Sequence, residues 1–297
     1  MMINQHSLTM LTQAVNARFN VGLQRAQPNW QVVGMEIPSM TSENVYPYLK
    51  QFGTIRKWVG DRVIQNMAKG EFRIVNDDYE QTHAIPRKAI EDDQYGIYGA
   101  VFEQTGDNVA RHADKLVYDL LKAGFDTLGP DGQYFFDTDH PVGKPGQEAS
   151  VANFMGGAGA AWFLVDSSKP IKPLIFQPRR SFQLITYFDP SDERVFWNKE
   201  FVWGVDGRSG AGYSPFWQLC FASKQTLDAT NLRAAMVAMS SQKDDAGEPI
   251  DVTATHLVVS PAQQEIANDL VSKEFLSGGE SNTLRGRLKV VVSGRLL

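Results

Sequence analysis

The hydrophobic residues predict two helices early in the chain, one of them unusually long. Over residues 7–25, apolar side chains recur at helical spacing, and Ser7 stands where a capping residue is expected. Over residues 97–123, apolar residues trace one face of a helix about 40 Å long. We expect Gly106 to weaken and bend the middle of this helix, and Gly124 to end it.

The second half of the chain alternates strand-like runs with two shorter helices. Residues 226–240 are predicted as one helix, and Ser260 and Pro261 are expected to begin the other directly after a strand. The strand-like runs are "AWFLVD", "PLIFQ", "SFQLITYF", "RVFWNKEFVWGV", "FWQLCFAS", "THLVVS" and "LKVVVSGRLL". Mixed strands and helices with one dominant helix predict the α+β class.

Two segments carry too few apolar residues for a core of their own. Residues 26–49 show no clear period, which fits an extended arm that reaches another subunit or an ordinary connector. Residues 56–75 are predicted as a hairpin that turns at "NMAKG", inside a β excursion over residues 50–93. Because such an excursion is marginal alone, we expect it to pack on a partner and to add little to the core.

Composition narrows the functional classes. The 297 residues carry a net charge of −5, which argues against a surface built to coat nucleic-acid phosphates. The single cysteine, Cys220, excludes an internal disulfide and is predicted to be a core residue. No apolar run is long enough to span a membrane, and the N-terminal residues do not follow the pattern of an export signal.

One stretch could carry chemistry. "YFFDTDHPVG" at residues 134–143 places Asp137, Asp139 and His140 within four residues, so a metal-dependent hydrolase or a histidine base oriented by a carboxylate is one interpretation. The other is a short strand, Tyr134–Phe136, followed by a turn in which His140 is structural, since Asp favours turns and Pro141 fixes an extended residue before it. The structural interpretation is favoured, because no second histidine lies at metal-ligand spacing.

Glycine-rich segments give no phosphate-binding motif. Residues 204–212, "GVDGRSGAG", and residues 155–162, "MGGAGAAW", lack both the Lys-Ser/Thr ending of a P-loop and a βαβ context. We predict that both are loops or bulges.

Several stretches, in order along nearly the whole chain, resemble the major head subunits of Mu-like bacteriophages. They are "WVGDRVIQNM", "IEDDQYGIYGAVFEQTG", "LVYDLLKAGF", "DGQYFFDTDHPVG", "WFLVDSSKPIKPLIFQPRR", "VFWNKEFVWGVDGRSGAGYSPFWQ" and "HLVVSPAQQEIANDLVSKEF". The resemblance implies the Hong Kong 97-type capsid fold, with an N-terminal arm, an extended β loop called the E-loop, a peripheral domain with a long spine helix, and an axial domain. It implies no catalytic residues and no cofactor.

The expected domains follow from that resemblance, with a permuted strand order in the second half. They are the N-terminal helix and arm (1–49), the E-loop (50–93), the peripheral domain with the spine helix (94–149), axial-domain strands (150–190), a return to the peripheral domain (191–245) and the axial-domain core (246–297). The E-loop is expected to contact a neighbouring subunit through Trp58, Arg62, Ile64, Asn66, Met67, Lys69, Gly70, Phe72 and Ile74.

The resemblance also implies a set of partners. We expect hexamers and pentamers in an icosahedral shell around double-stranded DNA, which is held without sequence-specific binding. A separate scaffold protein, a protease, a portal protein and a decoration protein are expected partners, and no membrane is. The predicted location is the phage head, assembled in the host cytoplasm.

Overall fold

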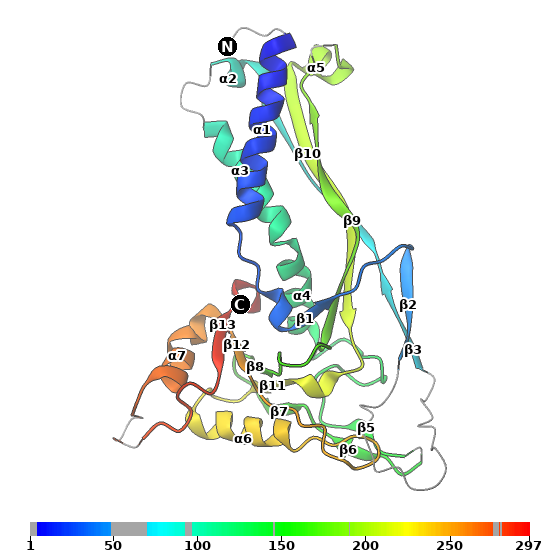
Figure 1. Ribbon diagram of the computed structural model, residues 1–297, viewed down its shortest axis with the longest axis vertical. Helices are drawn as coiled ribbons and strands as arrows, with labels where there is room; N and C mark the ends of the chain where they lie inside the picture. Colours follow the sequence, from blue (N-terminus) through cyan, green and yellow to red (C-terminus); the bar gives the residue numbers. More distant parts are fainter. Residues whose placement is uncertain are drawn as a thin grey trace.

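The computed structural model describes residues 5–48, 70–92, 97–144, 146–189, 191–275, 279 and 281–297. Figure 1 shows an elongated molecule with a narrow upper part, built from long helices and long strands, and a broader lower part. The helices are α1 (Gln5–Arg25), α2 (Arg87–Glu91), α3 (Ile97–Ala110), α4 (His112–Ala123), α5 (Glu193–Asn198), α6 (Ala229–Ser240) and α7 (Gln264–Ser272). Short 3-10 turns occur at Trp30–Val32, Trp217–Leu219, Pro261–Gln263 and Gly294–Leu296.

The strands form two main sheets and two short ribbons. The long sheet has the order β1-β9-β10-β4, and the five-stranded sheet has the order β13-β12-β8-β11-β7. The long sheet contains β1 (Gly34–Glu36), β4 (Asp77–Pro86), β9 (Leu174–Tyr187) and β10 (Glu200–Tyr213). The five-stranded sheet contains β7 (Phe154–Gly157), β8 (Trp162–Val165), β11 (Cys220–Lys224), β12 (His256–Val259) and β13 (Lys289–Val292). The ribbons pair β2 (Glu43–Tyr48) with β3 (Gly70–Val75), and β5 (His140–Val142) with β6 (Ala149–Val151).

The upper part is a long sheet with helices on one face. In Figure 1, α1, α3 and α4 lie along one side of β9, β10 and β4. Of the described elements, β3 packs on the other side, where it contacts Gly210 and Gly212 of β10. The buried apolar cluster between these layers contains Leu8, Val15, Ile85, Ile90, Phe102, Phe188, Val195, Phe201 and Trp203. The apolar stripe of the predicted first helix therefore faces this core, as its spacing indicated.

Helices α1 and α3 approach each other through glycines. A Cβ atom on Gly22 would lie 1.9 Å from the carbonyl oxygen of Glu103, and one on Gly106 would lie 2.1 Å from that of Phe19. Each glycine is thus pressed against the backbone of the other helix, where no side chain fits. Gly106 does not interrupt α3, and it allows the close contact with α1 that its sequence context did not indicate.

The predicted 97–123 helix is interrupted at Arg111, where a single turn residue separates α3 from α4. Hydrogen bonds nevertheless continue across this point, from Arg111 N to Asp107 O and from Lys115 N to Arg111 O, both at 3.0 Å. α4 then carries its buried residues, including Val117 and Leu121, into the lower part of the molecule.

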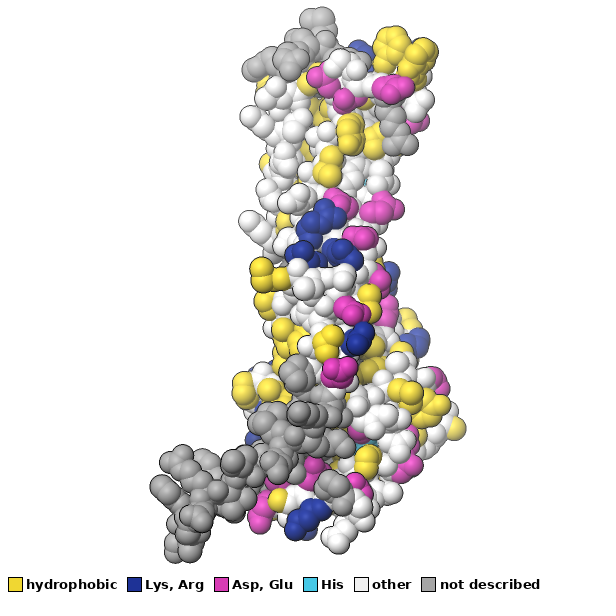
Figure 2. Space-filling model, turned by 90° about the vertical axis from the view of Figure 1, so that its right-hand side faces the viewer, with side chains coloured by type: hydrophobic (Ala, Val, Ile, Leu, Met, Phe, Trp, Pro, Cys, Tyr) yellow, Lys and Arg dark blue, Asp and Glu magenta, His cyan; other side chains and the backbone are white. Residues whose placement is uncertain are grey.

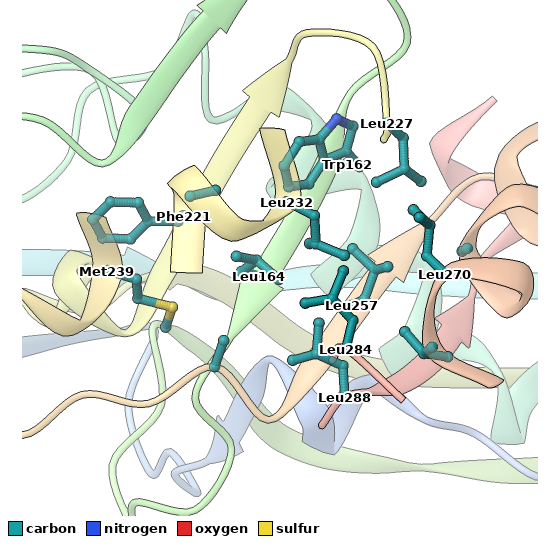
Figure 3. Packing of buried hydrophobic residues seen from close by; sticks show 14 of the residues in the cluster. Trp162, Leu164, Phe221, Leu227, Leu232, Met239, Leu257, Leu270, Leu284 and Leu288 are labelled. Carbon is teal, nitrogen blue, oxygen red and sulfur yellow. The ribbon is translucent and has the colours of Figure 1, made fainter. Parts of the chain in front are cut away.

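The five-stranded sheet is covered on both faces, and every residue of β8 is buried. Trp162 and Leu164 of β8 face α6 and α7 in the cluster drawn in Figure 3, which also contains Leu232, Met239 and Leu270. The alternate residues, Phe163 and Val165, face the C-terminal half of α4, Phe135, Phe136 and Trp217. This explains why β8 reads as a continuous apolar run in the sequence.

The glycine-rich segment 204–212 was predicted as a loop or bulge, but it lies inside strand β10 and is irregular only between Asp206 and Ser209. Its glycines accommodate close neighbours. A Cβ atom on Gly210 would lie 2.2 Å from the carbonyl oxygen of Val75, and one on Gly212 would lie 2.5 Å from the Ile74 side chain.

Other boundaries also differ from expectation. Ser7 lies inside α1 rather than ahead of it, "RVFWN" forms helix α5, and Tyr134–Phe136 form no strand beyond one bridge from Tyr134 to Leu128. The runs "PLIFQ" and "SFQLITYF" join into the single strand β9. The final 3-10 turn replaces the end of the strand predicted for the C-terminus.

The two sheets divide the chain differently from the expected domain ranges. β4 pairs along its whole length with β10, so residues 77–86 belong to the chain's own long sheet, contrary to the expectation that residues 50–93 pack on a partner. β9 lies in the long sheet although it falls within 150–190, while β11 and α6 belong with the five-stranded sheet although they fall within 191–245.

Candidate functional site

His140, the centre of the candidate chemical site, is completely buried. Its Nδ1 atom lies 2.6 Å from Oδ2 of Asp131, and its Nε2 atom lies 3.1 Å from Oδ1 of Asn153. Its ring stacks on Trp217 at 4.0 Å between centroids, with 13° between the planes. Both nitrogens and one ring face are therefore occupied by the protein, which leaves no free atom for a substrate or a metal ion.

The two aspartates of the predicted cluster do not join His140. Asp137 Oδ1 accepts a hydrogen bond from Thr138 N at 2.7 Å, and the side chain of Asp139 is exposed. Slight desolvation and the neighbouring Asp137 raise the pKa of the Asp139 carboxyl above its ordinary value. Among the described residues, no three His, Cys, Asp or Glu side chains are placed to hold a metal ion. The geometry gives no support to the hydrolase alternative.

Sequence reasoning missed the actual partners of His140. Asp131 lies nine residues earlier, and Asn153 also bridges the backbone of Phe135 and Cys220 through its amide nitrogen, at 2.8 and 3.3 Å. The polar cluster thus ties the 131–140 loop to strand β11. The sequence does contain an indication of Asp131, because a buried histidine needs polar partners and the preceding loop is rich in Asp, Pro and Gly. Asp137 and Asp139 are nearer to His140 in the sequence, however, and were the partners predicted.

Most residues predicted for the intersubunit loop lie outside the described residues: Trp58, Arg62, Ile64, Asn66, Met67 and Lys69. Gly70 begins β3 opposite Tyr48, so β3 pairs with β2 of the predicted arm. Phe72 stacks on Tyr46 at 5.0 Å. Ile74 is only 2% exposed and packs against β10, so it belongs to the interior of its own chain rather than to a contact surface.

The ribbon of β2 and β3 is fixed to the long sheet by a polar network. Gln177 of β9 accepts a hydrogen bond from Tyr46 Oη at 2.6 Å and donates one to Asn76 Oδ1 at 2.7 Å. Asn76 in turn donates to Ser39 Oγ at 2.9 Å. Gln177, Asn76 and Ser39 are all buried. The base of the predicted E-loop is therefore held in place by buried hydrogen bonds, although the ribbon itself buries little.

Large apolar side chains are exposed at the far upper end. Phe196 and Trp197 of α5 are 65% and 72% exposed and contact each other edge to face, and Ile185 and Tyr187 of β9 are also exposed. Figure 2 shows hydrophobic side chains at this end, whereas Lys and Arg side chains gather midway along the same face. Exposed aromatic clusters of this kind mark protein contact sites.

His112 lies where α4 meets the long sheet. Its Nε2 atom is 2.9 Å from Ser209 Oγ, and its ring packs against Tyr79 and Phe182. Burial, aided by the charge of Lys115, lowers the pKa of His112 from 6.5 to about 4. This histidine is therefore neutral in the folded chain near neutral pH. Cys220 is buried, as expected of a core residue.

No helix among the described residues is both long and apolar enough to cross a membrane.

The family model described as "Mu-like prophage major head subunit gpT" matches residues 8–296. The chain is 34% identical to the major capsid protein of Escherichia phage Mu, with all of both proteins covered. It is 36% identical to a Mu-like prophage major head subunit of Haemophilus influenzae, with 86% of each covered.

Solved structures agree in fold. A chain of the procapsid of bacteriophage JBD30 superimposes with a TM-score of 0.87 at 36% identity, covering 99% of this chain and all of that one. A chain of the JBD30 capsid decorated with minor capsid protein trimers gives a TM-score of 0.77 at 30% identity, with 93% of each covered.

Proposed function

Because the chain belongs to the family of Mu-like major head subunits, we propose that it forms hexamers and pentamers that close into an icosahedral head around double-stranded DNA. The observation that carries this proposal is the full-length match, in sequence and in fold, to a procapsid subunit. The chain is thus a phage capsid protein of the α+β class. A structural role without catalysis agrees with the saturated surroundings of His140.

Two surfaces of the upper part support repeated contacts between copies. The face of the long sheet opposite the helices presents Ile185 and Tyr187, and the tip presents Phe196 and Trp197. These side chains contribute no hydrophobic free energy while they stay in water. Their burial at an interface would be favourable by about 25 cal/mol per Å² of apolar surface. Many modest contacts of this kind, repeated around a closed shell, would add up to a stable particle.

We propose that residues 49–69 extend the ribbon of β2 and β3 onto a neighbouring subunit and act as the E-loop clasp. The anchored base supports this role, since Gln177, Asn76 and Tyr46 fix the direction in which the ribbon leaves the sheet. Phe72 and the exposed Val45 and Val75 give the ribbon an apolar surface that a neighbour could cover. A two-stranded ribbon alone is marginal, so a partner surface would stabilise it.

We further propose a separate scaffold protein, a maturation protease and a portal protein as assembly partners. A decoration protein is also proposed, supported by the minor capsid protein trimers on the related JBD30 capsid. DNA would be enclosed without sequence-specific binding, in line with the net charge of −5. The lower and upper parts would correspond to axial and peripheral domains.

Electron microscopy of the purified chain, produced with and without the proposed scaffold protein, tests this function. We expect capsomers or irregular assemblies from the chain alone and uniform closed shells when the scaffold is present. Uniform shells formed efficiently by the chain alone would contradict the need for a separate scaffold. A chain that stays monomeric under both conditions would contradict the capsid function itself.

A further inference from the structure

A hollow of about 560 Å³ lies beside the exposed face of α6, where the segments that lead into β12 and β13 pass close to the helix. Apolar side chains form part of its wall, among them Met236 and Ala254, and Val237 is 64% exposed. Two arginines, Arg233 and Arg287, complete the wall, and none of its described lining residues is acidic. We call this feature the arginine groove.

Neither arginine of the groove has an acidic partner in the described part of the chain. Arg233 donates one hydrogen bond, to Thr283 Oγ1 at 3.3 Å, and no described carboxylate oxygen lies within 4.0 Å of either guanidinium. A guanidinium pairs most strongly with a carboxylate, because its planar fork matches the two oxygens and it is weakly hydrated. The chemistry that suits the groove is therefore a carboxylate carried beside an apolar surface.

The chain carries two neighbouring carboxylates, Asp137 and Asp139, beside the other edge of the sheet that β13 borders. The carbonyl oxygen of Asp137 accepts hydrogen bonds from Asn153 N and Phe154 N, which places Asp137 and Asp139 beside edge strand β7. Within the described residues, neither carboxylate forms an ion pair with a lysine or arginine. Arg287 precedes β13, the other edge strand, and four strand spacings correspond to about 19 Å.

We propose that the arginine groove of one copy receives the Asp137 and Asp139 carboxylates of a second copy. Arg287 of the groove and the acidic pair are opposite in charge and adjoin the two edge strands of one sheet, and the two surfaces are made of different residues, so the contact is heterologous. Heterologous contacts generate closed rings when the rotation between copies closes. This inference rests on the proposed capsid function, and it assigns an assembly role to the acidic pair that leads into β5.

Charge reversal on each side, alone and together, tests the pairing. The variants are Asp139→Lys, Arg287→Glu and the combination of both, with Asp119→Lys on the exposed surface of α4 as a control of equal charge change. Sedimentation velocity measures the fraction of the full chain in capsomers, and circular dichroism confirms that each variant is folded. We expect each single reversal to lower that fraction about tenfold, and the combined variant to recover it to within about threefold of the unmodified chain.

The outcomes separate the pairing from the proposed function. If the unmodified chain forms capsomers and the single reversals form them equally well, or if the combined variant is no better than the worse single one, the pairing is wrong and the capsid function stands. An equal loss with Asp119→Lys also overturns it, because net charge would then explain the effect. A monomeric unmodified chain counts against the capsid function instead. Should a reversal prevent folding, Asp139→Asn and Arg287→Gln replace the two charges, with an expected loss of about threefold each.

Discussion

The long sheet and the five-stranded sheet differ in how much of their surface the chain itself covers. The five-stranded sheet has apolar clusters on both faces, so β8 is buried at every position. Among the described elements, the helices cover one face of the long sheet, and its other face is covered by β3 at one end and keeps Ile185 and Tyr187 exposed. The lower part therefore resembles an independent domain core, whereas the upper part is a sheet with one face largely open to the contacts proposed above.

The upper part compensates for its single covering layer by packing its helices unusually closely, and this contact is the most sensitive place to break. Replacing Gly22 or Gly106 with leucine would place a side chain where the opposing backbone lies about 2 Å from the new Cβ. We expect the free energy of unfolding to fall by about 3 kcal/mol or more, because the helices must separate. Urea denaturation of the soluble subunit measures this.

Gly99 of α3 provides the matched control. A Cβ atom added there would have the flexible Arg18 side chain as its nearest neighbour, at 3.6 Å, so Gly99→Ala should be neutral or should stabilise by up to about 1 kcal/mol. Equal losses at Gly99 and Gly106 would contradict this account, because Gly99 lies against no opposing backbone.

The lower part should be less sensitive at its polar cluster. His140→Asn removes the stacking on Trp217 and leaves the Asp131 carboxylate without its partner, so we expect the free energy of unfolding to fall by about 1–3 kcal/mol. The exposed Asp139→Asn should change it by less than about 0.5 kcal/mol. Thermal denaturation compares the two. A larger effect at Asp139, or a divalent ion bound jointly by Asp137, Asp139 and His140, would contradict the structural role.

Acid should weaken the junction of α4 with the long sheet through His112. Its folded pKa of about 4 lies below its ordinary 6.5, so the unfolded chain binds the proton more readily. Stability is therefore fully present above pH 6.5 and is lost progressively as the pH falls towards 4. His112→Asn should lessen this acid-side slope, which unfolding curves recorded between pH 7 and pH 4 can measure. An unchanged slope would show that other groups dominate acid unfolding.

The smallest effect on folding is expected when part of the proposed E-loop clasp, residues 49–69, is deleted. Deleting residues 54–65 leaves β2, β3 and the Gln177 network in place, so the free energy of unfolding should change by less than about 0.5 kcal/mol. Shell formation should fail or give fragile particles, because the proposed clasp is missing. Circular dichroism and electron microscopy on the same preparation measure the two effects. Normal particles would contradict the clasp role, and loss of folding would place the loop in the subunit's own core.

Local pattern was enough to predict elements with an apolar helical face or a continuous apolar run. The helix near residues 7–25 and α6 were predicted from helical spacing, β8 and β12 were predicted from strand-like apolar runs, and all four are confirmed. The α+β class, predicted from the mix of helices and strands, and the capsid fold implied by the resemblance are confirmed as well. Predictions failed at residues whose type is required by a neighbour distant in the sequence. Glycine in a helix usually indicates a weak point, but at Gly106 it is the backbone of Phe19 that leaves no room for a side chain.

The candidate site shows the same limit. Asp137 and Asp139 are nearest to His140 in sequence, but the loop folds so that Asp131 and Asn153 reach the imidazole instead. Likewise, Gly210 and Gly212 look like loop residues because the β3 segment that requires them lies well over a hundred residues earlier. The sequence pattern predicts which face of an element is buried. It does not identify which segment, distant in the sequence, packs against that element.

Strands β9 and β10 run side by side for 14 residues each, about 46 Å, from the lower core to the exposed tip. Their hydrogen bonds lie across the strand direction. A pull on the tip along this axis therefore loads all of those bonds at once, in shear, instead of opening them one after another. In a closed shell whose wall contains this axis, internal pressure would load the subunit along the direction in which these strands resist best, and such a particle should yield first at contacts between subunits.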